Sequence, residues 1–145
     1  MQDFNYKISI VPVSLVGLLW EQMEPIIQRA ANLSLEEVSM EYTKNSIFNG
    51  NMMPLIVYDG SEIIAVNILE IQEFPTGLRA LVATLVAGDR MDEWGLEVLE
   101  IEKSIAKDLN CAELRGFAAR KGWMKKLSTL GWEEVHTTIR CKIGK

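Results

Sequence analysis

The stretch that decides the fold is residues 79–95, RALVATLVAGDRMDEWG. Residues 79–87 are apolar almost throughout, and such a run predicts a strand covered on both faces of a sheet. From Asp92 to Leu109 the apolar residues recur at helical spacing. The turn from Gly88 to Gly95 therefore joins a buried strand to a long helix. We expect the chemistry of the chain to depend on this turn.

Strand and helix signals continue on both sides of this stretch. Ser34-Leu35-Glu36-Glu37 is a capping box, which predicts the start of a helix. Asp59-Gly60 predicts a two-residue hairpin turn. In chain order the expected elements are a strand over 6–11, a helix over 15–30 with Ser14 as its N-cap, a helix over 34–44, strands over 54–58, 62–71 and 79–87, a helix over 92–109, a strand over 112–116, a helix over 120–130 and a strand over 132–143. This order, β-α-α-β-β-β-α-β-α-β, predicts an α/β (α+β) fold.

Length and composition predict one soluble domain over residues 1–145. The chain is 48% hydrophobic and 24% charged, which is ordinary for a packed globular protein. No apolar run approaches the roughly 18 to 20 residues of a membrane span, and no signal peptide is visible. Cys111 and Cys141 lie far apart without metal-ligand spacing, so they are expected to be free thiols in a reducing compartment. We therefore expect a cytoplasmic location and no membrane partner.

Charge is distributed unevenly along the chain. The net charge is −5, yet residues 113–145 carry eight basic and three acidic residues. The basic cluster with its nearby tryptophans consists of Arg115, Arg120, Lys121, Lys125, Lys126, Trp123 and Trp132. Such a cluster can hold an anion or an acidic partner, or it can simply be a solvated helix face. The overall acidity argues against nucleic acid as the dedicated partner.

The order of elements, with Trp132 directly after a helix stop at Gly131, resembles the GNAT superfamily of acetyl-CoA-dependent N-acetyltransferases. The resemblance covers nearly the whole chain and rests on element order more than on a diagnostic motif. It implies a mixed, mostly antiparallel central sheet flanked by helices.

This resemblance implies a cofactor site at the end of the apolar strand. In the family, the central strand separates from its neighbour and acyl-CoA pairs with the freed backbone groups, here those of Leu85, Val86 and Ala87. The next turn follows the pattern Gln or Arg, two residues, Gly, one residue, then Gly or Ala. Its N–H groups and the helix N-terminus hold the pyrophosphate. Arg90 takes the first position of this pattern and Gly95 takes its last.

The turn also departs from the family pattern. Glu93 stands where a glycine is expected, and Asp89 and Asp92 add two further carboxylates. Carboxylates at a helix N-terminus stabilise it by roughly 0.3 to 1 kcal/mol each. Their negative charges already interact with the positive end of the helix, which a phosphate would otherwise use, and they would repel a pyrophosphate. The turn is therefore better interpreted as an acidic N-cap, and the acetyl-CoA site as degraded.

The last helix lacks the residues that the family places there. A tyrosine four residues before the closing glycine serves the family as general acid, and here that position holds Leu127. A leucine side chain cannot donate a proton. The family's Asn and Ala positions hold Arg120 and Trp123. None of the three positions matches the family.

Three residues are candidates for catalysis by position alone. Glu70 and Glu73 lie in or just after a central strand, where the family often has a general base. His136 is the only histidine and lies in the expected last strand. Residues of these types in strands are more often solvated than catalytic. With one histidine and no suitably spaced thiolate, we expect no metal site.

Three functions are compatible with these residues. The first is an active N-acetyltransferase that moves an acetyl group from acetyl-CoA to a small-molecule amine. The second is a GNAT-like fold without catalysis, which binds a protein partner or another copy of itself and needs no cofactor. Small bacteriophage proteins with degenerate cofactor turns are similar, and residues 119–123 resemble them, which would place the chain in the host cytoplasm or the virion. The third is a regulatory domain for a small acyl or amino ligand. The altered turn and the missing tyrosine favour the second.

Overall fold

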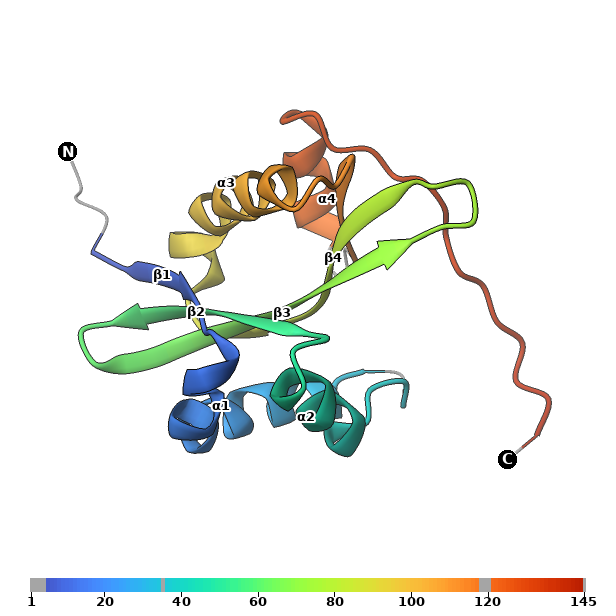
Figure 1. The fold of residues 1–145 in the computed structure, drawn as a ribbon. Coiled ribbons are helices and arrows are strands. Elements are labelled where there is room, and N and C mark those ends of the chain that lie inside the picture. Colours follow the sequence, from blue (N-terminus) through green and yellow to red (C-terminus); the bar gives the residue numbers. More distant parts are fainter. Residues whose placement is uncertain (1–4, 35, 118–120, 145) are drawn as a thin grey trace.

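A computed structural model describes residues 5–34, 36–117 and 121–144, and these residues form one sheet with helices on both faces (Figure 1). The elements are β1 (Lys7–Ile10), α1 (Val13–Asn32), α2 (Met40–Phe48), β2 (Met53–Asp59), β3 (Glu62–Glu73), β4 (Arg79–Gly88), α3 (Met91–Asp108), β5 (Glu113–Gly116) and α4 (Lys121–Ser128). In the described residues the strands lie in the order β1-β2-β3-β4-β5. The first three pairings are antiparallel and β4–β5 is parallel. The predicted mixed, mostly antiparallel α/β fold is confirmed.

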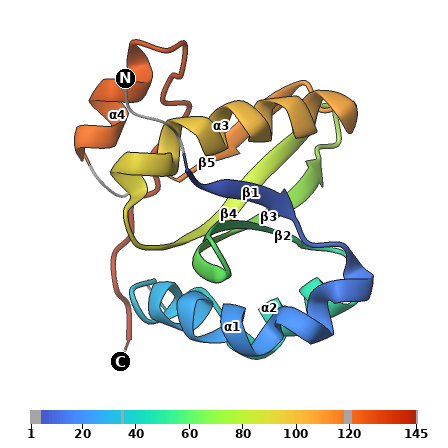
Figure 2. The same ribbon diagram turned by 90° about the vertical axis from the view of Figure 1, so that its left-hand side faces the viewer.

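Two apolar cores lie on the two faces of the sheet. Helices α1 and α2 cover one face, and α3 covers the other (Figure 2). The first core contains the buried side chains Met23, Ile27, Ile47, Val66 and Ile68. The second contains Leu55, Val57, Leu69, Leu81 and Trp94. Because both faces are covered, β2, β3 and β4 are apolar along most of their length, as the sequence predicted for residues 79–87.

The first helix begins earlier than its predicted cap. Helix α1 begins at Val13 with Pro12 as its N-cap, so the assignment of Ser14 as N-cap was wrong. Pro12 has extended backbone angles, and its carbonyl accepts a hydrogen bond from the Leu15 N–H at 2.9 Å. The fixed φ of proline suits a helix entry, and among the described residues no side chain caps α1 with a hydrogen bond.

The predicted capping box does not begin the second helix. Helix α2 begins at Met40, where the hydroxyl of Ser39 accepts a hydrogen bond from the Tyr42 N–H. The Ser34 hydroxyl instead donates to the carbonyl of Ala31 in the last turn of α1. Glu36 has a φ of 63°, which is incompatible with a continuous right-handed helix. Leu35 lies outside the described residues.

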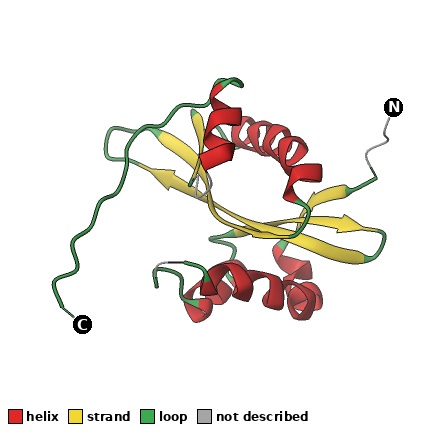
Figure 3. Ribbon diagram, turned by 180° about the vertical axis from the view of Figure 1, so that it is seen from behind, coloured by secondary structure: helices red, strands yellow, loops and turns green. Residues whose placement is uncertain are grey.

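The predicted last strand is also absent. Residues 132–144 follow α4 as a loop and belong to no strand (Figure 3). Their alternating pattern is genuine, but a strand requires a neighbouring backbone to pair with, and this segment has none among the described residues. None of the helices that the structure describes is long and apolar enough to cross a membrane.

Candidate functional site

The end of β4 has an unpaired edge. Strand β5 pairs with β4 only from Ala80 to Ala83, whereas β4 continues to Gly88. Over the residues that the structure describes, the backbone from Thr84 to Ala87 therefore has no strand beside it on the β5 side. These are the backbone groups that the resemblance assigns to a cofactor. They include Leu85, Val86 and Ala87.

A bulge lies at the start of this edge. Ile68 of β3 is opposite Leu85, but Leu69 is opposite Ala83, so Thr84 is the additional residue. The Thr84 hydroxyl donates to the Ile68 carbonyl at 3.2 Å. Bulges bend a strand and redirect its side chains, and they are common next to functional sites. Val86 beyond the bulge is 40% exposed although it lies on a central strand, so this end of β4 faces solvent.

The turn after β4 has a fixed backbone. Gly88 has a φ of 132°, and it lies so close to β3 that a Cβ here would collide with the carbonyl oxygen of Ile64. The Asp89 N–H donates to that same carbonyl at 3.1 Å. The indole N–H of Trp94 donates to the Asp89 carbonyl at 2.6 Å, and the Glu93 N–H donates to the Arg90 carbonyl at 2.9 Å. The first turn of α3 thus has part of its backbone already hydrogen-bonded within the chain.

Arg90 is the N-cap residue of α3, and its side chain turns toward β1 and β2. Its Nη1 lies 3.3 Å from the Oδ2 of Asp59, and its guanidinium carbon lies 5.5 Å from the ring centroid of Tyr6. The Tyr6 hydroxyl donates to the Glu93 carboxylate at 2.7 Å, and this hydrogen bond raises the pKa of the Tyr6 phenol. Strands β1 and β2 lie on the β3 side of β4, and the unpaired edge lies on the β5 side. The guanidinium therefore points away from that edge.

The carboxylates of the turn have partners within the fold. Asp89 lies 3.4 Å from Arg29 of α1, and Glu93 accepts the Tyr6 hydroxyl. The side chain of Asp92 is exposed. The three acidic residues that the sequence singled out do gather at the N-terminus of α3. Two of them hold the turn to α1 and to the start of the chain.

Gly95 is buried against α4. A Cβ at this position would lie 2.7 Å from the Cη2 of Trp123. The Lys126 ammonium lies 5.3 Å from the centroid of the Trp123 ring. Close packing between α3 and the tryptophan thus accounts for this glycine without a phosphate.

One buried acid was missed by the sequence analysis. Glu102 of α3 is 1% exposed, and burial raises its pKa to about 7. The Asn67 amide donates to its Oε2 at 3.4 Å, while the Asn67 Oδ1 has no hydrogen-bond partner among the described residues. A signal was available, because Glu102 follows Val98 by four residues in the apolar stripe and Asn67 interrupts an apolar strand.

The predicted catalytic candidates do not come together. Glu70 lies on β3 opposite Val82, and Glu73 at the end of β3 forms an ion pair with Arg79. The turn after β4 lies near the start of β3, where Ala65 pairs with Gly88. Glu70 and Glu73 lie toward the other end of β3. His136 is exposed in the loop after α4.

The basic cluster is partly engaged with neighbouring side chains. Arg115 lies 2.6 Å from Glu113 and stacks 4.8 Å from the Phe74 ring centroid. Arg120 lies outside the described residues, as do Ala118 and Ala119. In the described part of the chain, no group of three or more His, Cys, Asp or Glu side chains could hold a metal ion.

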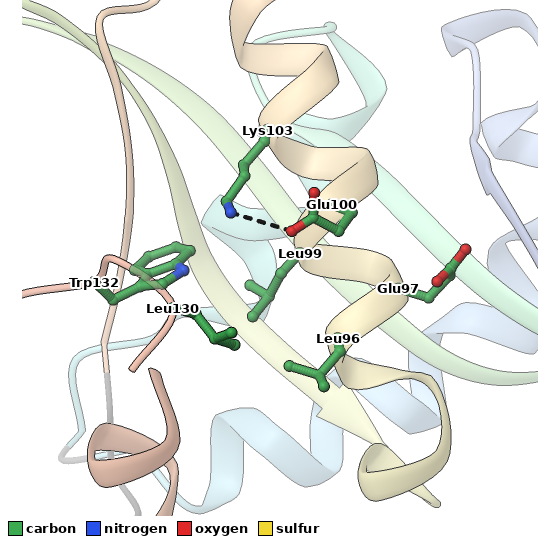
Figure 4. Close-up of a pocket in the computed structure, with 7 residues that line it drawn as sticks. All are labelled: Leu96, Glu97, Leu99, Glu100, Lys103, Leu130 and Trp132. Atoms are coloured by element: carbon green, nitrogen blue, oxygen red, sulfur yellow. Dashed lines mark hydrogen bonds and ion pairs between the residues drawn. The ribbon is translucent and has the colours of Figure 1, made fainter. Parts of the chain in front are cut away.

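A pocket of about 250 Å³ lies on the outer side of α3 (Figure 4). The helix contributes one wall, and the segment after α4 contributes the other. Its lining residues are Leu96, Glu97, Leu99, Glu100, Lys103, Leu130 and Trp132. The charged groups of Lys103 and Glu100 pair with each other at 3.1 Å. The other lining residues are mostly apolar, so a bound group would make mainly apolar contacts.

Comparison with known proteins identifies the fold. No protein-family sequence model matches the chain, and no curated protein matches it by sequence. A ribosomal-protein-alanine N-acetyltransferase from Brucella melitensis biovar Abortus 2308 is similar in structure, with a TM-score of 0.69 and 14% identity over 96% of this chain and 99% of that chain. A predicted acetyltransferase from Clostridium acetobutylicum, solved with acetyl-CoA, has a TM-score of 0.66 and 16% identity over 94% and 96%. A GCN5-related N-acetyltransferase from Ralstonia eutropha JMP134 has a TM-score of 0.63 and 13% identity over 96% and 99%. The chain has the GNAT acetyltransferase fold.

Proposed function

We propose that this chain uses the GNAT fold as a binding or structural component and that its acetyl-CoA site is degraded. The observation that carries the proposal is the direction of Arg90. The resemblance places this residue first in the turn whose N–H groups hold the cofactor's pyrophosphate, but its positive charge is directed elsewhere, because its guanidinium pairs with Asp59 and Tyr6. It therefore faces the β3 side of β4 while the unpaired edge of β4 faces the β5 side.

The charge at the N-terminus of α3 supports the same proposal. A helix N-terminus attracts an anion through its positive dipole end and its free N–H groups. Here the first turn carries the carboxylates of Asp92 and Glu93, and Glu93 is held in place by the Tyr6 hydroxyl. A pyrophosphate would have to approach these carboxylates. Leu127, in the place of a proton donor, adds a second difficulty for catalysis.

The partner in this proposal is a protein, and the chain would be one component of a larger assembly such as a bacteriophage particle. The C-terminal part of the chain supports a protein partner because it exposes several large apolar side chains. They are Phe117, Leu130, Val135, Ile139 and Ile143. Exposed apolar side chains mark an association surface where they gather into one patch.

Active N-acetyl transfer is the second candidate, and one observation favours it. Beyond the bulge at Thr84, no described strand lies beside Leu85, Val86 and Ala87 on the β5 side, so the backbone groups that face this side are open to an extended ligand. In that case acetyl-CoA would supply the acetyl group, and the chain would hold it along β4 while a small-molecule amine attacks the acetyl carbonyl. The coenzyme A thiolate would then leave and take up a proton.

Thermal unfolding with and without acetyl-CoA separates the two functions. A ligand at a hundred times its Kd adds about 2.7 kcal/mol to the free energy of unfolding. We expect no change in Tm at millimolar acetyl-CoA. A clear increase in Tm that Arg90→Ala abolishes would establish the cofactor site instead. Lys103→Ala is the matched control, because it removes an exposed cation from the same helix far from the turn.

A further inference from the structure

The segment after α4 carries an uncovered apolar face. Over residues 133–143 the odd positions are mostly apolar and the even positions mostly polar. In an extended chain these two sets lie on opposite sides. Val135, Ile139 and Ile143 share one side and are 61%, 90% and 93% exposed. The segment has the pattern of a half-buried strand, but no strand that the structure describes pairs with it.

Strand β5 offers an open sheet edge. It is the last strand in the order, and among the described residues only β4 pairs with it. Leu114 packs toward the core under α3, and Glu113 and Arg115 lie on the opposite face of the strand. Unpaired backbone groups at an edge are a template for one more strand.

We propose that residues 137–140 of a second copy pair antiparallel with β5, with Ile139 opposite Leu114 and Arg140 opposite Glu113. Apolar side chains must share the Leu114 face, which excludes every register shifted by one residue. The proposed register also places a cation opposite an acid. Glu113 at present contacts Arg115 at 2.6 Å, and Arg140 would add a second cation to that carboxylate.

The path of the segment favours a second copy over the same chain. The backbone N–H of Trp132 donates to the Leu127 carbonyl at 3.1 Å. The indole ring of Trp132 lines the pocket on α3 (Figure 4). From this anchor the segment runs past the sheet toward the layer of α1 and α2 and does not return along β5 (Figures 1 and 2). Residues 133–136 can span about 13 Å as an extended arm. Exchange of two such arms gives a closed twofold dimer.

Charge reversal tests the exchange directly. We expect the wild-type chain to be a dimer by light scattering after size exclusion, and Glu113→Arg and Arg140→Glu each to raise the dimer Kd about tenfold or more. An equimolar mixture of the two variants should recover the dimer, because both exchanged contacts again join opposite charges. Pairing within one chain cannot give this recovery. A monomeric wild type, or a mixture that stays monomeric, would overturn the proposal.

Two further variants keep the test independent of β5 folding. Ile139→Asp changes only an exposed arm residue and should also leave the protein monomeric, with an unchanged Tm of the monomer. Lys142→Glu is the matched control, since in this register it lies beyond the end of β5 and should leave the dimer Kd unchanged. A dimer that persists in Ile139→Asp contradicts the proposed contact.

Discussion

The guanidinium of Arg90 at the start of α3 lies 3.3 Å from the carboxylate of Asp59 at the end of β2. This contact closes the turn after β4 against the β2–β3 hairpin. It also fixes the one basic residue of the turn on the side away from the unpaired edge of β4. The relationship thus bears on both the stability of the turn and its ability to hold an anion.

Removing this ion pair should affect stability little. The side chains of Arg90 and Asp59 are 40% and 48% exposed, and exposed ion pairs contribute about 0 to 1 kcal/mol. Asp59→Asn should therefore lower the free energy of unfolding in urea by less than about 1 kcal/mol. A loss of several kcal/mol would mean that the pair is a structural requirement of the turn. Glu100→Gln, which removes the exposed Lys103 pair, is the matched control.

The turn backbone should tolerate substitution far less well. Gly88→Ala introduces a Cβ that collides with the Ile64 carbonyl and lies 2.5 Å from the Ala65 Cα, at a φ of 132°. Both neighbours are backbone of a central strand and cannot move away. We expect a loss of about 3 kcal/mol or more in the free energy of unfolding. Gly60→Ala is the comparison, since Gly60 also has a positive φ but no atom of the described residues lies within 4 Å of its Cβ, and the substitution should cost about 1 to 2 kcal/mol.

The strand, turn and helix around Gly88 could be predicted because their signals are local and agree with the tertiary structure. An apolar run, a hairpin dipeptide and a helical stripe each correspond to an observed element. Residues 34–37 also match a local pattern, the capping box, but no helix begins there and α2 begins at Met40 instead. The Ser34 hydroxyl bonds backward to Ala31, and Glu36 takes a left-handed conformation.

The details of the site depend on long-range contacts that no local pattern encodes. The sequence identified Arg90 and the acidic turn, but the partners Asp59 and Tyr6 come from distant strands. The segment over 132–143 has the composition of a strand, but it can form one only by pairing with the edge of a sheet, and the local sequence does not specify that edge. The burial of Glu102 was not predicted, because acidic side chains are mostly exposed in folded proteins.

Gly95 and Trp123 should show coupled effects. Gly95→Ala places a Cβ 2.7 Å from the Trp123 indole, so the single variant should lose about 1 to 2 kcal/mol of stability. In a Trp123→Ala background the collision is gone, and alanine is favoured over glycine in a helix by about 1 kcal/mol. The sign of the Gly95→Ala effect should therefore reverse, which a double-mutant cycle in urea measures. Equal effects in both backgrounds would show that the indole does not pack on Gly95.

Burial of Glu102 should make stability depend on pH. Burial raises its pKa from an ordinary 4.5 to about 7 in the folded protein. Between these values the folded chain keeps a proton that the unfolded chain has lost, so a rise in pH favours unfolding. The free energy of unfolding should fall by about 3 kcal/mol over this range and lose nothing further from this group above it.

Urea unfolding at a series of pH values tests this dependence on Glu102. The variant Glu102→Gln keeps the shape of the side chain and its contact with Asn67 but cannot lose a proton. Its stability should therefore lack the decrease between pH 4.5 and about 7 that the wild type shows. Glu97→Gln is the control, since this exposed acid on the same helix should leave the wild-type slope intact. Equal slopes in wild type and Glu102→Gln would mean that the carboxyl titrates normally, and that the space around it admits water or a counter-charge in solution.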